Sequence, residues 1–185
     1  WALAWVNQET PALDVPAIEY VIDGDREFRQ LEAELQAAND RNDGHAIATL
    51  HGKLDAIDAW TIRSRAASLL HGLGFSNEQL QSPVRDFSGG WRMRLNLAQA
   101  LVCRSDLLLL DEPAAGMTDA ETDYTAELFR ELAGKHSLMV VEHDMGFVET
   151  IADRVTVLHQ GQVLAEGSLA QVQADERVIE VYLGR

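Results

Sequence analysis

The sequence lacks the features of a secreted or membrane-embedded protein. Its 185 residues include one cysteine, Cys103, so neither an internal disulfide nor a zinc cluster built from cysteines can form. The strand-like apolar run Leu107 to Leu110 is far shorter than the roughly 20 residues of a membrane helix, and no basic segment followed by a long apolar one opens the sequence. We therefore expect a cytoplasmic protein with no membrane insertion and no secretion signal, and Cys103 as a small core residue.

Basic residues are also scarce, which disfavours direct contact with nucleic acid. The chain carries 15 Lys and Arg against 30 Asp and Glu, a net charge of −15, and residues 111–185 combine 5 basic with 15 acidic side chains. Binding nucleic acid by displacing counterions needs clustered Lys and Arg, which the sequence does not contain. The 46% of apolar and 24% of charged residues are ordinary for a globular protein, so we expect one domain with a real core.

The first half of the chain is predicted to be mainly helical. Residues 2–7 are apolar and favour a short buried strand that runs into a turn at Pro11. Over residues 16–60 apolar side chains recur at helical spacing with a break near residues 39–44, which predicts two amphipathic helices. A third helix is expected over residues 61–72. Such stripes most often pack in a core, and a partner-binding surface is the alternative.

After Ser76 strands alternate with helices, which indicates an α/β fold with a mainly parallel sheet. Strands are predicted for Leu107 to Leu110 and Ser137 to Glu142, and the helix between them begins with a capping box of Thr118 and Glu121. The other expected elements are a helix over 91–103, a helix over 145–151, a hairpin of 155–159 with 162–166, a short helix capped by Ser168 and a closing segment over 178–183.

Two adjacent carboxylates, Asp111 and Glu112, end a predicted buried strand. Ligands of parallel sheets bind at the carboxyl ends of strands, and carboxylates there favour Mg²⁺ with a nucleotide phosphate. Asp111 would hold the metal and Glu112 would polarise the attacking water. His143 could contact a terminal phosphate or orient Glu112, and Gln8 could reach the metal or the water. The alternatives are a solvated acidic turn and an unrelated metal-dependent hydrolase that uses Asp111, Glu112 and His143.

The segment Ser88-Gly89-Gly90 precedes a predicted helix and could bind a phosphate. Free N–H groups at a helix start attract anions. Ser88 could donate a hydrogen bond to a phosphate, and Gly89 and Gly90 have no side chains to block the approach. The alternative is that Ser88 only caps its own helix.

In this order, the segments resemble the ATP-binding cassette (ABC) ATPases. Gln8 is similar to the Q-loop glutamine, and residues 87–91 are similar to the signature motif. Residues 107–112 resemble the Walker B strand with its catalytic glutamate, and residues 114–119 resemble the D-loop region. His143 is similar to the switch histidine. The resemblance implies ATP and Mg²⁺ as cofactors and an incomplete P-loop NTPase (RecA-like) fold with a helical subdomain. It also implies the roles of the site residues. Catalysis would use Glu112, His143 and Gln8, and ATP would be bound by Ser88, Gly89 and Gly90. The metal would be bound by Asp111 and Gln8.

The resemblance also divides the chain into three parts. A Q-loop strand and turn would take residues 1–15, a helical subdomain with an insertion residues 16–85, and part of a RecA-like core residues 86–185. Residues 1–113 resemble the first cassette of bacterial ABC-F proteins, whereas residues 111–185 resemble the ATP-binding subunits of urea and branched-chain amino-acid importers. We therefore interpret the chain as a hybrid, or chimera, joined at the Walker B strand.

One motif of the ABC family is absent from the sequence. A P-loop has the pattern G-x-x-x-x-G-K-[ST], and neither Gly52-Lys53 nor Gly134-Lys135 is followed by Ser or Thr. In the family the P-loop strand lies between the strands equivalent to residues 137–142 and 155–159. We therefore expect two free strand edges, which would pair with each other or exchange between two chains.

The sequence thus predicts a partial ATP-binding domain that is inactive alone. Phosphoryl transfer depends on the positioning and charge stabilisation that a P-loop provides, so the signature residues could serve only the nucleotide of a second cassette. The alternative is a non-enzymatic module whose acidic helices bind a partner. By resemblance that partner would be the ribosome or a membrane permease, and the charge of −15 argues against direct contact with RNA.

Overall fold

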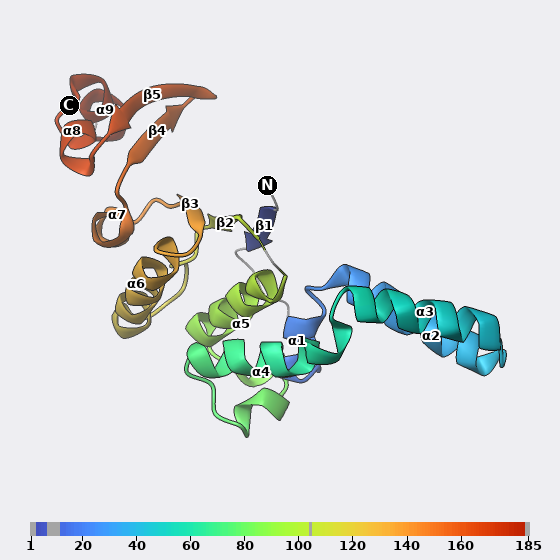
Figure 1. Ribbon diagram of the computed structural model, residues 1–185. Coiled ribbons are helices and arrows are strands. Elements are labelled where there is room, and N and C mark those ends of the chain that lie inside the picture. The colour runs from blue at the N-terminus through green and yellow to red at the C-terminus, as the bar shows by residue number, and fades with distance from the viewer. Residues whose placement is uncertain (1–2, 7–11, 104, 184–185) are drawn as a thin grey trace.

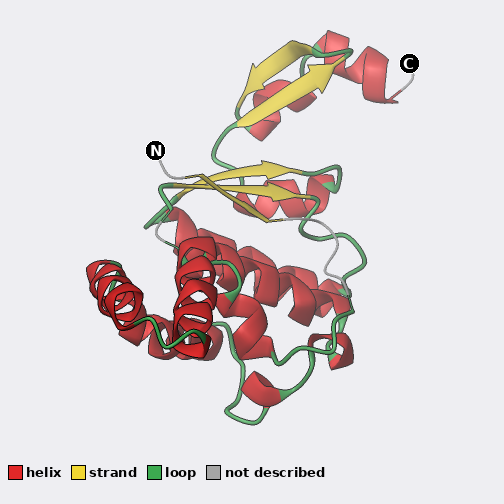
Figure 2. Ribbon diagram, turned by 90° about the vertical axis from the view of Figure 1, so that its right-hand side faces the viewer, coloured by secondary structure: helices red, strands yellow, loops and turns green. Residues whose placement is uncertain are grey.

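The computed structural model describes residues 3–6, 12–103 and 105–183. A parallel sheet lies at its centre, with helices on one side and a small C-terminal unit beyond it (Figures 1 and 2). The strands β1 (Leu3–Val6), β2 (Leu107–Asp111) and β3 (Ser137–Val141) follow the order β1-β2-β3. Both strand pairs are parallel, so the predicted α/β fold with a parallel sheet is confirmed.

Three helices form the main core next to the sheet. They are α1 (Ala17–Ile22), α4 (Ile62–Gly72) and α5 (Gly89–Val102). A short 3₁₀ turn, Ala59–Thr61, precedes α4, and two more, Gln79–Gln81 and Val84–Asp86, lie between α4 and α5. The sequence pattern predicted α4 and α5 and missed α1. Helix α1 has only six residues, which is fewer than two turns. It is largely buried, with Val21 and Ile22 at most 1% exposed and Glu19 as its single charged residue, so no helical period can be read from it.

Helices α2 (Arg26–Asp40) and α3 (Gly44–Ala56) form an antiparallel hairpin that projects away from the sheet (Figure 1). Asp25 caps α2 by accepting a hydrogen bond from the Phe28 N–H, and Asp43 caps α3 in the same way. The hairpin has its own core, formed by Leu31, Ala38, Leu50, Leu54 and Ala59. The two predicted amphipathic helices and the break between them are confirmed.

The chain after β2 also has the predicted elements. Helix α6 (Asp119–Ala133) begins with the capping box of Thr118 and Glu121, and α7 (Met145–Ile151) packs against it. The C-terminal unit contains β4 (Val155–His159), β5 (Gln162–Gly167), α8 (Leu169–Gln173) and α9 (Glu176–Leu183). No helix in the described ranges is long and apolar enough to cross a bilayer.

The central sheet is covered on one face only. Leu108 and Leu110 point into the core under α5 and α6, whereas Trp5 and Met139, on the opposite face, are 62% and 56% exposed. Within the described residues β3 pairs only with β2, and β4 pairs only with β5. The prediction that β3 and β4 re-pair within the chain is therefore wrong, because the tight hairpin already provides β4 with an antiparallel partner.

Candidate functional site

The first group of predicted site residues lies at the carboxyl ends of β2 and β3. Asp111 is the last residue of β2 and is in register with Val141, the last residue of β3. The Glu112 N–H donates to the Val141 carbonyl at 2.8 Å. The parallel register therefore brings Asp111 and Glu112 next to the segment that contains His143, as the sequence predicts.

Glu112 and His143 are in direct reach of each other. The distance from His143 Nδ1 to Glu112 Oε1 is 3.7 Å, and the two side chains are 76% and 36% exposed, respectively. Glu112 has a φ of +45°, an unfavourable backbone conformation for a residue with a side chain. Its N–H and its carbonyl are both engaged, the carbonyl accepting from the Ala115 N–H at 3.1 Å. Strained backbone that is held in this way is often found at functional sites.

Glu142 is a site residue that the sequence analysis did not single out. Its side chain is 1% exposed and accepts hydrogen bonds from the N–H groups of Ala114 at 2.8 Å, His143 at 3.1 Å and Asp144 at 3.4 Å. Glu142 thereby connects the turn after Glu112 to the turn that carries His143. The signal was available, since Glu142 follows β3 as Glu112 follows β2.

The second group of predicted residues lies at the start of α5. Ser88 is the N-cap of this helix and accepts a long hydrogen bond, 3.5 Å, from the Trp91 N–H. Ser88 Oγ also donates to Glu121 Oε1 at 2.6 Å. A Cβ added to Gly90 would lie 2.7 Å from Glu121 Cδ, so only glycine leaves room for this carboxylate over the helix start.

Helices α5 and α6 are held together one turn further along by a buried arginine. The Arg94 guanidinium lies 3.7 Å from the Tyr124 ring centre and 4.5 Å from that of Trp91, and Phe75 packs edge-on against Trp91. Burial lowers the pKa of Arg94 from its ordinary value, because the charged form loses hydration. The two aromatic faces compensate part of this loss.

The remaining predicted residue, Gln8, lies outside the described residues. The described residues contain no group of three or more His, Cys, Asp or Glu arranged to hold a metal. Mg²⁺ commonly binds through one or two carboxylates together with phosphate oxygens and waters, a donor set that Asp111 and Glu112 fit. Gly89 is exposed and leaves its backbone open to a phosphate oxygen, whereas Gly90 is buried under the Glu121 side chain.

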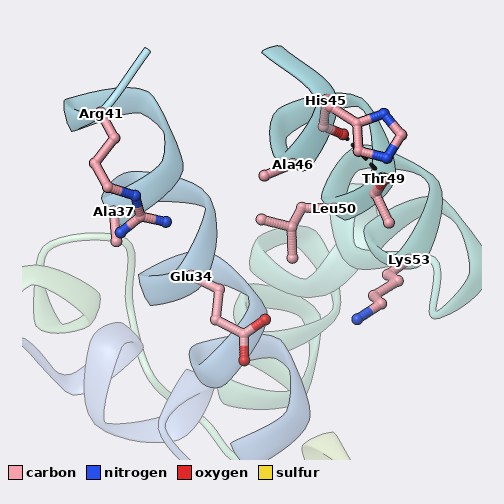
Figure 3. A pocket seen from close by; sticks show the side chains of 8 residues that line it. All are labelled: Glu34, Ala37, Arg41, His45, Ala46, Thr49, Leu50 and Lys53. Carbon is pink, nitrogen blue, oxygen red and sulfur yellow. Dashed lines mark hydrogen bonds between the residues drawn. The ribbon is translucent and has the colours of Figure 1, made fainter. Parts of the chain in front are cut away.

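A cavity of about 520 Å³ lies on the α2–α3 hairpin and contains none of these residues. It is a shallow groove between the two helices, into which Glu34 and Lys53 reach from opposite sides (Figure 3). Arg41 and His45 also line it. The groove is therefore separate from the strand ends and from the start of α5.

Comparison with known families agrees with the motifs. The profile of the ABC transporter family matches residues 8–115, more than half of the chain. A second profile, described as branched-chain amino acid ATP-binding cassette transporter, matches residues 162–185.

Comparison with individual proteins also finds ATP-binding cassette proteins. The probable ATP-binding protein YheS of Escherichia coli K12 is 66% identical over 160 residues, and the human ATP-binding cassette sub-family F member 3 is 38% identical over 166 residues. These stretches cover 86% and 85% of this chain, and 25% and 23% of the two relatives. The chain thus spans about a quarter of their length.

Solved structures share the fold at low sequence identity. An ATP-binding cassette of an ABC transporter in its ADP conformation superposes with a TM-score of 0.72 at 20% identity, covering all of this chain and 69% of the other. A nucleotide-free cassette gives a TM-score of 0.71 at 19% identity, with the same coverage. The P-loop NTPase type of fold expected from the sequence is therefore confirmed.

Proposed function

The chain belongs to the ABC transporter family as an ATP-binding domain related to sub-family F, and from this premise we propose that it presents Ser88, Gly89 and Gly90 to ATP held by a second cassette. The observation that carries the proposal is the start of α5. There a hydroxyl, two residues without side chains and the N-terminus of a 14-residue helix lie together, with Ser88 and Gly89 exposed and Gly90 buried beneath Glu121.

The chain's own strand ends would act on nucleotide in the same assembly. We propose that Asp111, with Gln8, binds Mg²⁺ through oxygen ligands, and that Glu112 polarises the attacking water. His143 lies close enough to Glu112 to orient it. Bound ATP and Mg²⁺ would supply the phosphoryl group and the charge neutralisation for hydrolysis. Gln8 and His143 complete the proposed catalytic set.

Hydrolysis by the 185-residue chain alone is not part of the proposal. The sequence contains no segment with the P-loop pattern, and therefore no lysine and glycine-rich loop placed to hold the β- and γ-phosphates. The division into residues 1–15, 16–85 and 86–185 belongs to the same proposal. The first part contains Gln8. The second part is the helical subdomain with its inserted α2–α3 hairpin. The third part contains Asp111, Glu112 and His143 at the strand ends, and helix α5 with the signature residues.

We also propose that the chain is a hybrid of two branches of the family. The identity to YheS supports the sub-family F branch, and the profile match over residues 162–185 supports a branched-chain amino-acid transporter branch for the C-terminal unit. Val141-Glu142-His143-Asp144-Met145 is the importer-like segment closest to the site. Its buried Glu142 contacts Ala114, which lies in the same importer-like part, directly after the proposed junction.

A non-enzymatic interaction module is the second candidate function. The groove on the α2–α3 hairpin and the exposed face of the central sheet favour it, since both offer surface that the chain does not cover itself. The ribosome or a membrane permease would be the partner by family resemblance. Self-association is a further possibility for the exposed sheet face and the free edge of β3.

The signature proposal is tested by retention of ATP between two proteins. A fluorescent ATP analogue with Mg²⁺ is titrated into an intact ATP-binding cassette whose catalytic glutamate is replaced by Gln, with and without this chain. We expect the chain to tighten nucleotide binding at least tenfold, and Ser88→Ala to remove most of the gain. Ser168→Ala, which removes an equivalent N-cap from α8, serves as the matched control.

The outcomes of this titration are distinct. A gain that Ser88→Ala abolishes and Ser168→Ala leaves intact supports the signature proposal. A gain that both variants keep, or no gain up to millimolar nucleotide, contradicts it and favours the interaction module. Glu112→Gln in this chain should keep the gain, because Glu112 is proposed to act on water and not to bind the signature-held phosphate.

A further inference from the structure

We propose that Glu121 is an intramolecular competitor of ATP, whose carboxylate occupies the phosphate position at the start of α5 and must leave Ser88 before nucleotide can bind. The inference rests on the proposed function of Ser88, Gly89 and Gly90. It adds a regulatory contact to that site, made by a residue of α6 that none of the motifs includes.

The position of the carboxylate is the main observation. Ser88 Oγ, the group proposed to donate to a phosphate oxygen, donates to Glu121 Oε1 at 2.6 Å. The same carboxylate lies over Gly90, where an added Cβ would be 2.7 Å from Glu121 Cδ and 2.8 Å from Oε1. The hydroxyl and the open backbone that would receive a phosphate are therefore both used by Glu121.

Electrostatics make Glu121 a true competitor and not a passive neighbour. The hydrogen bond from Ser88, together with those from Thr118, lowers the pKa of Glu121 from its ordinary value of 4.5, so the side chain is ionised at neutral pH. A carboxylate and a phosphate repel each other, and the positive end of the α5 dipole can neutralise only one of them. Nucleotide binding thus requires Glu121 to move.

The geometry of the capping box allows this movement at low cost. Glu121 Oε1 contacts Ser88, whereas Oε2 accepts hydrogen bonds from the Thr118 N–H and Oγ1, both at 3.1 Å. The two oxygens belong to one rigid carboxylate, so a rotation that releases Ser88 also moves Oε2 away from Thr118. The N-cap of α6 is kept, because the Glu121 N–H still donates to Thr118 Oγ1. The cost of release is therefore limited to side-chain hydrogen bonds of one carboxylate at the surface.

The test compares two glutamates of α6. Glu121→Gln removes the charge and keeps the size and an acceptor oxygen, and Glu127→Gln makes the same change at an exposed position on this helix. Both variants are measured in the ATP-retention titration with the intact cassette, beside the wild-type chain and Ser88→Ala. We expect Glu121→Gln to bind nucleotide about fivefold to tenfold tighter than the wild type, and Glu127→Gln to equal it.

A second variant separates competition from folding. Glu121→Ala removes the carboxylate and also the capping box, so it should weaken α6 slightly and still tighten nucleotide binding. If Glu121→Gln and Glu121→Ala match the wild type while Ser88→Ala loses the gain, the competition is overturned and the signature proposal stands. If none of the chains, including Glu121→Gln, tightens binding, both proposals are overturned.

Discussion

At the scale of single residues, the approach of α5 to the end of α1 depends on a glycine. A Cβ added to Gly24 would lie 2.2 Å from the Gln99 carbonyl oxygen and 3.0 Å from its carbonyl carbon, both backbone atoms of α5. Backbone atoms cannot rotate away as a side chain can. The packing of α1 on α5 therefore leaves no room for even one methyl group at Gly24.

We expect Gly24→Ala to lower the free energy of unfolding by about 1–3 kcal/mol, because the helices must separate to make room. Gly52 lies in the exposed part of α3 with no atom within 4 Å of an added Cβ. Gly52→Ala should raise the stability of its helix by about 0.5–1 kcal/mol, because alanine loses less backbone entropy. Urea unfolding of both variants checks the pair, and equal destabilisation would contradict the steric argument.

At the scale of secondary-structure elements, Glu19 connects three helices. This residue of α1 accepts hydrogen bonds from Arg29 of α2 and Arg63 of α4. Partial burial raises the pKa of Glu19, and the hydrogen bonds and charges of the two arginines outweigh that effect, so that the pKa is lower than the ordinary 4.5. The three-helix contact consequently favours the ionised carboxylate.

We expect Glu19→Gln to cost about 1 kcal/mol at pH 7, a value kept small because the side chains are partly exposed. A group with a lowered pKa stabilises the fold above its unfolded value and loses this contribution as the pH falls through the folded value. The difference between wild type and Glu19→Gln should therefore shrink as the pH is lowered below about 4.5. Denaturant unfolding across this range tests it, and exposed Glu180→Gln should show no such change.

Helix signals in the sequence were reliable where a helix has one apolar and one polar face. The amphipathic pattern predicted α2 and α3, and local side-chain chemistry predicted the capping box at Thr118 and the N-cap at Ser168. It failed for α1, because a six-residue helix with one charged position, Glu19, is too short to show a period. The position of Glu142 directly after β3 could have marked it as a site residue. Its contact with Ala114, 28 residues away, could not be predicted, since only the fold brings the two together.

At the scale of the whole molecule, one face of the central sheet is exposed. Leu3, Trp5, Met139 and Val141 are all more than half exposed on this face, and β3 has a free edge within the described residues. Contiguous apolar surface of this kind is typical of an interface. The proposed self-association follows from it.

We expect the wild-type chain to associate with increasing concentration and Met139→Lys to remain monomeric over the same range, since a lysine on an edge strand opposes pairing. Met145→Lys makes the same substitution at an exposed position at the start of α7, outside the sheet, and should associate like the wild type. Sedimentation velocity measures all three. A wild type that is monomeric at every concentration would exclude self-association through this face.

The sequence by itself determined the α/β class, most helices and strands, and the strand-end position of Asp111, Glu112 and His143, because hydrophobic period and capping are local properties. Only the tertiary structure decided three other features. It paired β3 only with β2 among the described residues, buried Glu142 between two turns, and placed Glu121 on Ser88 across 33 residues. Each depends on how distant segments pack, and the spacing of residues along one segment carries no information about its neighbours in space.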